Sequence, residues 1–147
     1  TNVVKSEKFS DIMQTAINRY LNGMLTNEQV IQELLSLARQ ISDAKNEGDS
    51  LGLTAEELAF YDALTKPQAI KDFYENDELI AITKELTDTL RKNKTIDWQK
   101  QSPARAQMRM LIKRLLKKHK YPPEGMDDAV QTVMTQCELW TDNCLFD

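Results

Sequence analysis

The sequence predicts an all-α protein, a single compact helical bundle of about six helices. Apolar residues recur at the three- and four-residue spacing of a helix through most of the chain. Only four Gly and four Pro occur in 147 residues, which favours long regular elements over a turn-rich sheet. No stretch alternates like a β-strand for long enough to matter, and there is no internal repeat. We therefore expect one helical domain over residues 1–147.

The composition is that of a globular chain, with 41% hydrophobic and 29% charged residues. No apolar run exceeds four residues, so no segment of the sequence could cross a bilayer. The N-terminal residues TNVVKSEKFS lack the apolar core of a signal peptide. Because the chain also lacks an initial Met, we expect a fragment of a longer protein or a processed chain. We expect it to be located in the cytoplasm.

Two long amphipathic helices are predicted at the N-terminal end. The first has one apolar face, formed by Phe9, Ile12, Met13, Ala16, Ile17, Tyr20, Leu21 and Met24. Thr26 and Gln29 form a capping box that opens the second helix. This helix is expected to end in the polar stretch 43–52 and to bury Val30, Ile31, Leu34, Leu35, Ala38 and Ile41.

The middle of the chain begins with a second capping box, formed by Thr54 and Glu57. Pro67 then breaks the helical pattern or begins the next helix at its first position. Asn76 is expected to cap a helix over residues 77–93, whose C-terminal charges, Arg91 and Lys92, suit the helix dipole. The apolar face of this helix consists of Leu79, Ile82, Leu86 and Leu90.

The last third of the chain is predicted to contain two helices. Ser102 followed by Pro103 is an N-cap and first-turn signature, so a helix should begin there. Pro122 and Pro123 end it. A final helix is expected over about residues 127–141, with an apolar stripe formed by Val130, Val133, Met134, Cys137 and Trp140.

The segment 98–123 has an unusual charge. It holds eight Lys or Arg and no Asp or Glu, although the net charge of the chain is -4. The rest of the chain has 11 basic and 23 acidic residues, which leaves it at 11 − 23 = −12. On a helical wheel, one set of side chains falls within an arc of about 100°, with Leu116 beside it: Ala104, Met108, Leu111, Ile112, Leu115 and His119.

The basic side chains lie on the remaining faces of this predicted helix. Four of them are opposite the apolar arc, namely Arg109, Lys113, Lys117 and Lys120, with Arg105 at the edge and Arg114 and Lys118 on the other shoulder. Such a surface can be solvated and partly balanced by acidic helices nearby. It can also bind an acidic protein, or the phosphates of duplex DNA with release of condensed counterions.

Two features of the sequence argue against DNA as the ligand of this surface. No aromatic residues are interleaved with the basic positions, as stacking on bases would require. The isoelectric point of about 5.1 is low for an autonomous DNA-binding domain. A basic stripe on an acidic domain is more typical of docking within a larger complex.

The sequence contains no recognisable catalytic motif. The four glycines are scattered, and none precedes the Lys-Ser or Lys-Thr pair of a phosphate-binding loop. Asp43 and Lys45 superficially resemble the spacing of a metal-dependent nuclease, which needs further converging carboxylates. His119 has no Ser or Cys partner in the sequence and is expected at a helix end, on the apolar side. We predict no catalytic residue, no metal and no cofactor in this segment.

Two cysteines, Cys137 and Cys144, lie seven residues apart. On one continuous helix their Cα atoms would be roughly 10 Å apart, which is too far for a disulfide. The only His is distant and no Cys-x-x-Cys pair exists, so zinc is not expected. We therefore predict free thiols in a reducing compartment.

Two segments carry a family resemblance: LTAEELAFYDAL at residues 53–64, and residues 96–125, joined by NDELIAITKELT. Together they resemble the helical C-terminal domain of the restriction (R, motor/endonuclease) subunit of type I restriction-modification enzymes. The resemblance covers roughly residues 9–140. The features that carry it are, in order, Glu57, Phe60, Tyr61 and Asp62, the pair Asp97 and Trp98, the spacing of Ala106 and Arg109, and the stop Tyr121, Pro122 and Pro123.

Pro103 departs from the pattern of this family. It interrupts a region that could otherwise continue as a helix from Trp98. Trp98 is therefore expected either to begin the basic helix or to form a separate turn.

The resemblance implies that the chain is the C-terminal assembly domain of a larger subunit with a metal-dependent nuclease domain and two helicase-like ATPase domains. Such a subunit is an ATP-dependent type I site-specific deoxyribonuclease of bacteria or archaea. It uses ATP and Mg²⁺, translocates double-stranded DNA and cleaves foreign, unmodified DNA. The implied partners are the methyltransferase (modification) and specificity subunits and the helicase domains of the same chain. Direct binding of duplex DNA by the basic helix 103–120 is the alternative.

Two groups of residues are therefore predicted to matter. The partner- or DNA-binding residues are Arg105, Arg109, Lys113, Arg114, Lys117, Lys118 and Lys120. The aromatic signature residues Phe60, Tyr61 and Trp98 are expected to anchor the core. Asp62 and Asp97 are expected to cap helices or to pair with Arg105 or Arg109. The sequence Tyr121, Pro122 and Pro123 should set the angle of the last helix.

Overall fold

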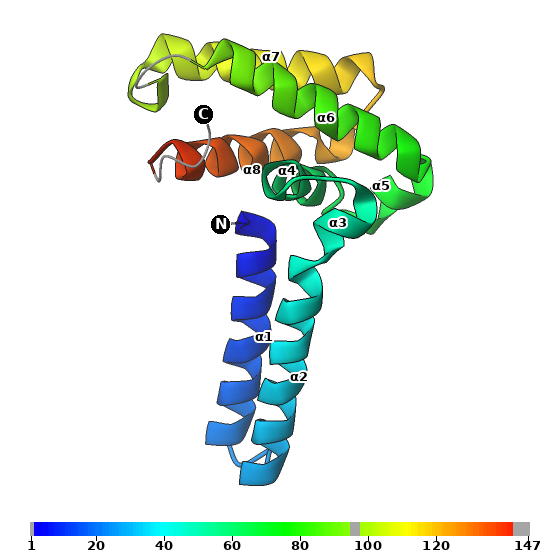
Figure 1. Cartoon of the computed structure of the whole chain (residues 1–147). Helices are drawn as coiled ribbons and strands as arrows, with labels where there is room; N and C mark the ends of the chain where they lie inside the picture. Colours follow the sequence, from blue (N-terminus) through cyan, green and yellow to red (C-terminus); the bar gives the residue numbers. More distant parts are fainter. Residues whose placement is uncertain (1, 95–97, 143–147) are drawn as a thin grey trace.

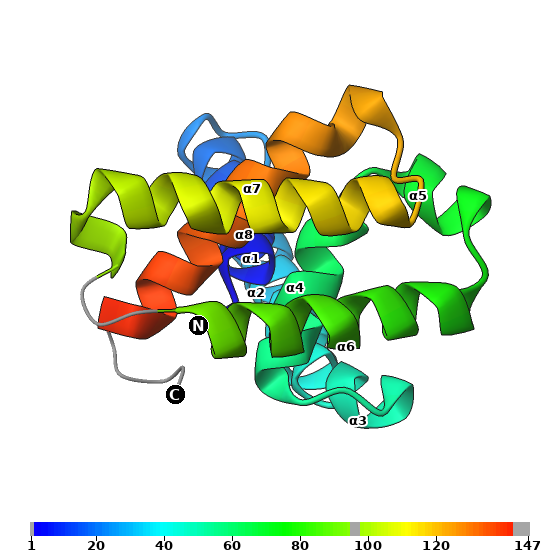
Figure 2. The ribbon, with the colours of Figure 1, turned by 90° about the horizontal axis from the view of Figure 1, so that it is seen from above.

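Helices make up all the regular secondary structure of residues 2–94 and 98–142, which the computed structural model describes. A body of two helical layers carries a projecting hairpin (Figure 1). The hairpin consists of α1 (Val3–Leu21) and α2 (Asn27–Lys45). In the body, α4 (Ala55–Leu64) and α8 (Pro123–Asp142) form the inner layer, and α6 (Asn76–Asn93) and α7 (Ser102–Lys118) the outer one (Figure 2).

Three short elements connect these long helices: α3 (Glu47–Leu51), α5 (Gln68–Phe73) and the 3₁₀ turn η1 (Trp98–Lys100). The six long helices were expected from the sequence, five from an apolar period and α4 from its capping box, so the all-α fold class is confirmed. The helix after Pro67 (α5) and the separate turn at Trp98 (η1) were among the predicted alternatives. Only α3 was not predicted, because a single helical turn contains too few residues to show a period. No helix among the described residues is long and apolar enough to cross a membrane.

The helix α4 is the centre of the core. All seven residues from Leu58 to Leu64 are buried, because α1, α6 and α8 pack around this helix. A helix that is apolar on every side is stable only when it is surrounded in this way. The largest fully buried side chains come from the body: Trp98, Phe60, Leu64, Leu86, Leu90, Met108, Ile112, Leu116 and Met134.

Both predicted capping boxes are confirmed. The Gln29 amide donates to Thr26 Oγ1 at 3.2 Å, and the Thr26 amide donates to Gln29 Oε1 at 2.9 Å. Thr54 and Glu57 make the same reciprocal pair at the start of α4. These bonds satisfy amides that have no partner inside the helix.

Three other helix starts differ from prediction. Asn76 is the first residue of α6 and not its cap, because the amide of Glu75 already donates to Glu78 Oε1. Ser102 is likewise inside α7, whose cap is Gln101. The last helix begins at Pro123 instead of near residue 127, since Pro is compatible with the first helical turn.

Trp98 forms the separate turn η1 and does not begin the basic helix. Its side chain is fully buried, 1% exposed. Pro103 falls in the first turn of α7, where its missing amide hydrogen costs no intrahelical bond. The proline therefore marks the break between turn and helix.

Two tyrosine hydroxyls form hydrogen bonds with carbonyls at the ends of helices. Tyr121 donates to the carbonyl of Leu64, at the end of α4, at 2.7 Å. Tyr74 donates to the carbonyl of His119, just after α7, at 2.6 Å. Carbonyls at helix ends have no intrahelical partner, so each hydroxyl satisfies a group that would otherwise be desolvated without a bond.

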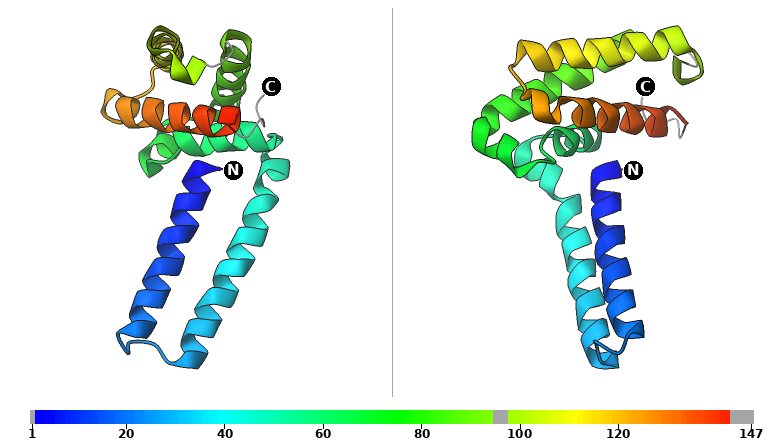
Figure 3. Two further views of the ribbon diagram at one scale, coloured as in Figure 1. Left: turned by 90° about the vertical axis from the view of Figure 1, so that its left-hand side faces the viewer. Right: turned by 180° about the vertical axis from the view of Figure 1, so that it is seen from behind.

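The two hairpin helices bury much less than predicted. Only Leu37 of α2 and Ala16 of α1 are buried. Ile31, Leu34 and Leu35, which were expected to be buried, are 55%, 38% and 50% exposed. The reason is that toward its tip the hairpin has no other described helix beside it (Figure 3), so each helix is covered on one side only.

A polar cluster joins the base of the hairpin to the body. The Asn2 amide group donates to Asp62 Oδ2 at 2.7 Å, and Lys5 Nζ lies 2.5 Å from Glu47 Oε2 and 3.3 Å from Asp62 Oδ2. Gln136 of α8 accepts from the amide of Val3 at 2.8 Å. These contacts connect α1, α3, α4 and α8.

The prediction that Asp62 caps a helix or pairs with Arg105 or Arg109 is wrong, because Asp62 faces the hairpin and α7 lies in the other layer. Burial raises the pKa of Asp62, and this outweighs the lowering by Asn2 and Lys5. Burial lowers the pKa of Lys5, but the hydrogen bond to Glu47 and the charges of Asp62 and Glu47 together raise it.

Some predictions concern residues outside the described part of the chain. They are the role of Asp97, the side chain of Trp140 and the separation of Cys137 from Cys144. Cys137 itself is buried in α8, 1% exposed. Burial raises the pKa of its thiol to about 12, so this thiol is protonated at neutral pH.

Replacing Tyr121 by Phe should test the tyrosine contacts. The change leaves the buried carbonyl of Leu64 without its donor, so the free energy of unfolding should fall by about 1–3 kcal/mol. Urea unfolding followed by circular dichroism measures this. Tyr20→Phe is the control, since the Tyr20 hydroxyl bonds to Asn27 at an exposed site and its loss should have little effect. Equal effects of both changes would contradict the argument.

Replacing Lys5 by Met should destabilise the protein in a pH-dependent way. The buried Asp62 carboxylate loses its cation, so stability at pH 7 should fall by about 1–3 kcal/mol or more. The folded-state pKa of Asp62 is raised, so ionising this carboxyl group lowers the free energy of unfolding. This cost is largest above the folded-state pKa and is absent below the unfolded-state pKa, where the group is protonated in both states. The deficit of the variant should therefore shrink toward pH 4.

The measurement is urea unfolding of the Lys5→Met variant and the parent chain between pH 4 and 8. Lys71→Met provides the control, because Lys71 is exposed and no ion pair links it to the described residues. It should have little effect at any pH. A deficit of the same size at every pH would show that Lys5 does not act through Asp62.

Candidate functional site

Helix α7 lies at the outer surface of the body and exposes most of its basic residues. Its inner face packs on α6, α8 and η1 through Met108, Ile112, Leu115 and Leu116. The buried arc is rotated toward Leu116, which is fully buried, whereas Ala104 and Leu111 are only half-buried. The rotation leaves the opposite side of the helix, with its cations, in solvent.

At the N-terminal end of α7, two arginines contact the rest of the body. Arg105 donates to the carbonyl of Gln99 at 3.1 Å and forms an ion pair with Glu138 of α8. Arg109 donates to the side-chain oxygen of Gln131 at 3.3 Å. Arg105 thus balances an acidic residue of its own chain.

At the C-terminal end, one carboxylate binds two basic side chains. Glu85 of α6 accepts from Lys118 at 2.7 Å and contacts His119 Nε2 at 2.6 Å. The hydrogen bonds from Lys118 and His119 lower the pKa of Glu85. His119 caps the end of α7 and is half-buried, as expected for a helix-terminal His. The Nε2 atom of its ring is engaged in the contact with Glu85 of α6.

Four basic residues remain exposed, and their side chains make no hydrogen bond or ion pair to the described residues: Lys113, Arg114, Lys117 and Lys120. We call them the basic face. They span about two helical turns, or roughly 10 Å at 1.5 Å per residue. Lys120 follows the helix in a left-handed conformation with φ 61°, in the turn that leads to α8. The basic face thus has three positive charges on α7 and a fourth in the turn after it.

The structure separates the predicted binding residues into two groups. Arg105 and Lys118 form ion pairs within the chain, so part of the basic segment is an internal charge match. Arg109 has a neutral partner in Gln131. The side chains of the basic face have no acidic neighbour of this kind among the described residues.

The residues considered for catalysis do not converge. Asp43 and Lys45 are both exposed on α2. Two residues apart on an α-helix, they point about 160° away from each other. Among the described residues, no group of three or more His, Cys, Asp and Glu is placed to hold a metal ion.

The family signature residues build the scaffold that holds α7. Phe60, Tyr61, Trp98 and Tyr121 are all buried, and Tyr121 bonds to α4 immediately after α7 ends. Pro122 is half-buried, and Pro123 is the first residue of α8. A buried turn before α7 and a fastened turn after it define the direction in which the basic face points.

Sequence reasoning missed the polar cluster of Asn2, Lys5 and Glu47 around Asp62. The partners are up to 60 residues apart in the chain, and no local pattern connects them. The only signal was an Asp inside an otherwise apolar segment, which implies a buried carboxylate that needs a partner.

Comparison with known proteins supports the family suggested by the sequence. The family described as "Type I restriction enzyme HindI endonuclease subunit-like, C-terminal" matches residues 1–143. The HindI type I restriction enzyme endonuclease subunit of Haemophilus influenzae is 41% identical over 138 residues, which are 94% of this chain and 13% of that protein.

A second relative is the MjaIXP type I restriction enzyme endonuclease subunit of Methanocaldococcus jannaschii, a provisional designation. It is 34% identical over 128 residues, 86% of this chain and 12% of that protein. The chain thus spans about an eighth of the length of these curated relatives. No solved structure matches it. The extent of the match identifies the chain as a member of the family of C-terminal regions of HindI-like type I restriction endonuclease subunits.

Proposed function

We propose that this region is an assembly domain that docks a type I restriction endonuclease subunit onto its methyltransferase core. The observation that carries the proposal is the basic face of α7, where Lys113, Arg114, Lys117 and Lys120 are exposed without acidic partners among the described residues. The other basic side chains of α7 contact the body: Arg105 pairs with Glu138, Arg109 with Gln131 and Lys118 with Glu85.

The charge distribution favours a protein partner with an acidic surface. The chain has a net charge of -4, so the basic face is a local exception on a negative molecule. Such a patch orients an acidic partner and speeds its association while the remaining surface repels misaligned encounters. Because α7 is held at both ends, the backbone positions of Lys113, Arg114 and Lys117 keep their spacing, and only the side chains are ordered on binding.

ATP and Mg²⁺ would act in other domains of the full-length subunit, in the cytoplasm, together with the nuclease and motor functions. The modification and specificity subunits and the helicase domains of the same chain are the partners that this role requires. Duplex DNA is the competing ligand, because four cations over two helical turns can also neutralise phosphates. The negative charge of the rest of the chain opposes an approach to DNA.

Reversing the basic face should weaken assembly without unfolding the domain. In the triple variant Lys113→Glu, Arg114→Glu and Lys117→Glu, the substituted side chains are exposed, so helicity and melting temperature should change little. The complex with an assembled methyltransferase core should weaken at least about tenfold, because three attractive contacts become repulsive. Light scattering at physiological salt measures the complex.

The matched control reverses three exposed cations outside α7, namely Lys8, Arg39 and Lys71. It changes the net charge by the same amount, so it separates the effect of the basic face from that of overall charge. The control should assemble normally. Normal assembly of the α7 variant, or equal loss in both variants, would contradict docking through the basic face.

A salt titration separates the DNA alternative from protein docking. If the basic face bound duplex DNA, the logarithm of the binding constant would fall linearly with log salt, with a slope of about −3 to −4 for four phosphates. We expect the chain alone to show no binding at physiological salt, by fluorescence anisotropy of a labelled duplex. Binding with that slope, abolished in the triple variant, would assign the face to DNA.

A further inference from the structure

Two exposed apolar side chains of the body border the basic face. Among the described residues outside the hairpin, only two large hydrophobic side chains are exposed: Phe73, which is 61% exposed, and Met110, which is 58% exposed. Apolar side chains scattered over a protein surface are ordinary. These two are not scattered, because one lies at each end of the row of cations that forms the basic face.

Met110 points away from the body, on the same side of α7 as the cations. At 100° per residue, its side chain points about 120–160° away from every buried side chain of this helix. Lys113 and Arg114 follow it by three and four residues, so they are its neighbours on the helix surface. Lys117, two turns further, points within about 20° of it. Met110 is therefore the N-terminal end of the row.

Phe73 flanks the other end of the row. It is the last residue of α5, and its ring makes an edge-on contact with the ring of Tyr74, with 4.8 Å between the centroids. The Tyr74 hydroxyl donates to the carbonyl of His119, the residue before Lys120. One buried tyrosine thus separates Phe73 from the end of the basic face. Lys71 points about 160° away from Phe73 on α5 and lines a hollow beside α1, so it lies outside this surface.

The two side chains are close enough to be covered by one partner. From Met110 to Lys118, the last residue of α7, the helix rises about 12 Å at 1.5 Å per residue. Phe73 lies just beyond that end. One partner's share of a standard interface is about 800 Å², or roughly 30 Å across. A single interface therefore has room for both apolar side chains and for the cations between them.

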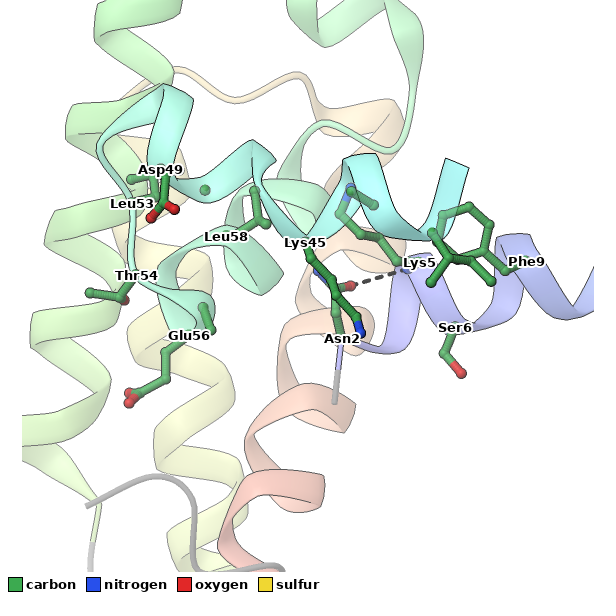
Figure 4. A pocket seen from close by; sticks show the side chains of 14 residues that line it. Asn2, Lys5, Ser6, Phe9, Lys45, Asp49, Leu53, Thr54, Glu56 and Leu58 are labelled. Atoms are coloured by element: carbon green, nitrogen blue, oxygen red, sulfur yellow. Dashed lines mark hydrogen bonds between the residues drawn. The ribbon is translucent and has the colours of Figure 1, made fainter. Parts of the chain in front are cut away.

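The hollow at the base of the hairpin does not combine apolar surface with charge in this way. Its volume is about 720 Å³, and Figure 4 shows Lys5 and Lys45 among the residues that line it, together with Asp49 and Glu56. Charges of both signs thus surround the hollow, and they do not favour a partner of either charge. The surface on α7 differs, because its charges are all positive.

We propose that Met110 and Phe73 are the apolar anchors of the docking surface, and that its partner is an acidic protein segment with apolar side chains on both sides of its carboxylates. The inference rests on the proposed docking through the basic face. It adds the residues that supply affinity and the chemistry of the segment that binds. The carboxylates of the partner lie over the cations, and its apolar side chains pack on the two anchors.

The anchors distinguish a protein partner from duplex DNA. The sugar-phosphate backbone of a duplex is bound mainly by hydrogen bonds and charge, and it gives Met110 and Phe73 little on which to pack. Interfaces between proteins are enriched in Met and aromatic residues, and a few such anchors supply most of their affinity. The uniform positive charge between the anchors selects carboxylates and disfavours a basic or neutral segment.

Single substitutions of the anchors test the proposal in titrations with the assembled methyltransferase core, followed by light scattering. Met110→Gln and Phe73→Ser should each raise the dissociation constant of the complex about three- to tenfold, because each removes an apolar contact. Both side chains are exposed, so helicity and melting temperature should change little. The salt dependence of binding should also stay the same, since neither substitution alters a charge.

Met24→Gln is the matched control, because Met24 is 66% exposed at the tip of the hairpin, away from α7. It should assemble like the parent chain. If the triple charge reversal weakens assembly but both anchor variants behave like Met24→Gln, docking through the basic face stands and the anchors are wrong. If the triple variant assembles normally as well, the docking itself is wrong and the anchors with it.

Photo-crosslinking tests the chemistry of the partner. A benzophenone amino acid in place of Met110, or of Phe73, becomes linked on irradiation to groups in direct contact with it, and mass spectrometry identifies the linked segment of the methyltransferase core. We expect one segment from both positions, with Asp or Glu between the two linked sites. A linked segment without carboxylates would overturn the proposal. Absence of links to the core, or links to added duplex DNA instead, would do the same.

Discussion

The burial of the Asp62 carboxylate is the constraint on which the arrangement of the molecule depends. Asp62 lies in α4, a helix covered on every side, and its raised pKa reflects the loss of water around its charge. A buried carboxylate requires donors and a cation, and Asn2 and Lys5 supply them from the first turn of α1. The start of the hairpin is therefore held against the core, and the rest of it projects away from the body.

This arrangement gives the protein two surfaces of different chemistry at different ends. The basic face of α7 lies on the outer layer of the body, where four cations have no acidic partner among the described residues. One side of the hairpin is apolar, with Met13, Ile17, Ile31 and Leu34 exposed. A charged surface contributes mainly to the rate and orientation of binding, whereas an apolar one contributes mainly to affinity. The two surfaces thus suit two different contacts within one assembly.

Local sequence signals predicted the six long helices well, because five carry a clear apolar period and α4, which is apolar on every side, begins at a capping box. Errors occurred where neighbouring residues compete for the same role. Asn76 is a good cap by type, but Glu75 already has Glu78 in the capping-box position. Ser102 and Pro103 located the beginning of α7 to within one residue. The contacts of Asp62 were out of reach, since residues 60 positions apart in the chain share no local pattern.

The sequence by itself determined that the protein is helical, where its long helices lie and that α7 has a basic side. It also indicated the family, which the match over residues 1–143 confirms. Only the tertiary structure decided which cations of α7 meet acidic residues of the body and which remain open. It alone showed that the apolar side of the hairpin is uncovered. The physical reason is that periodicity reports the polarity of a helix face, whereas its burial depends on which distant segments pack against it.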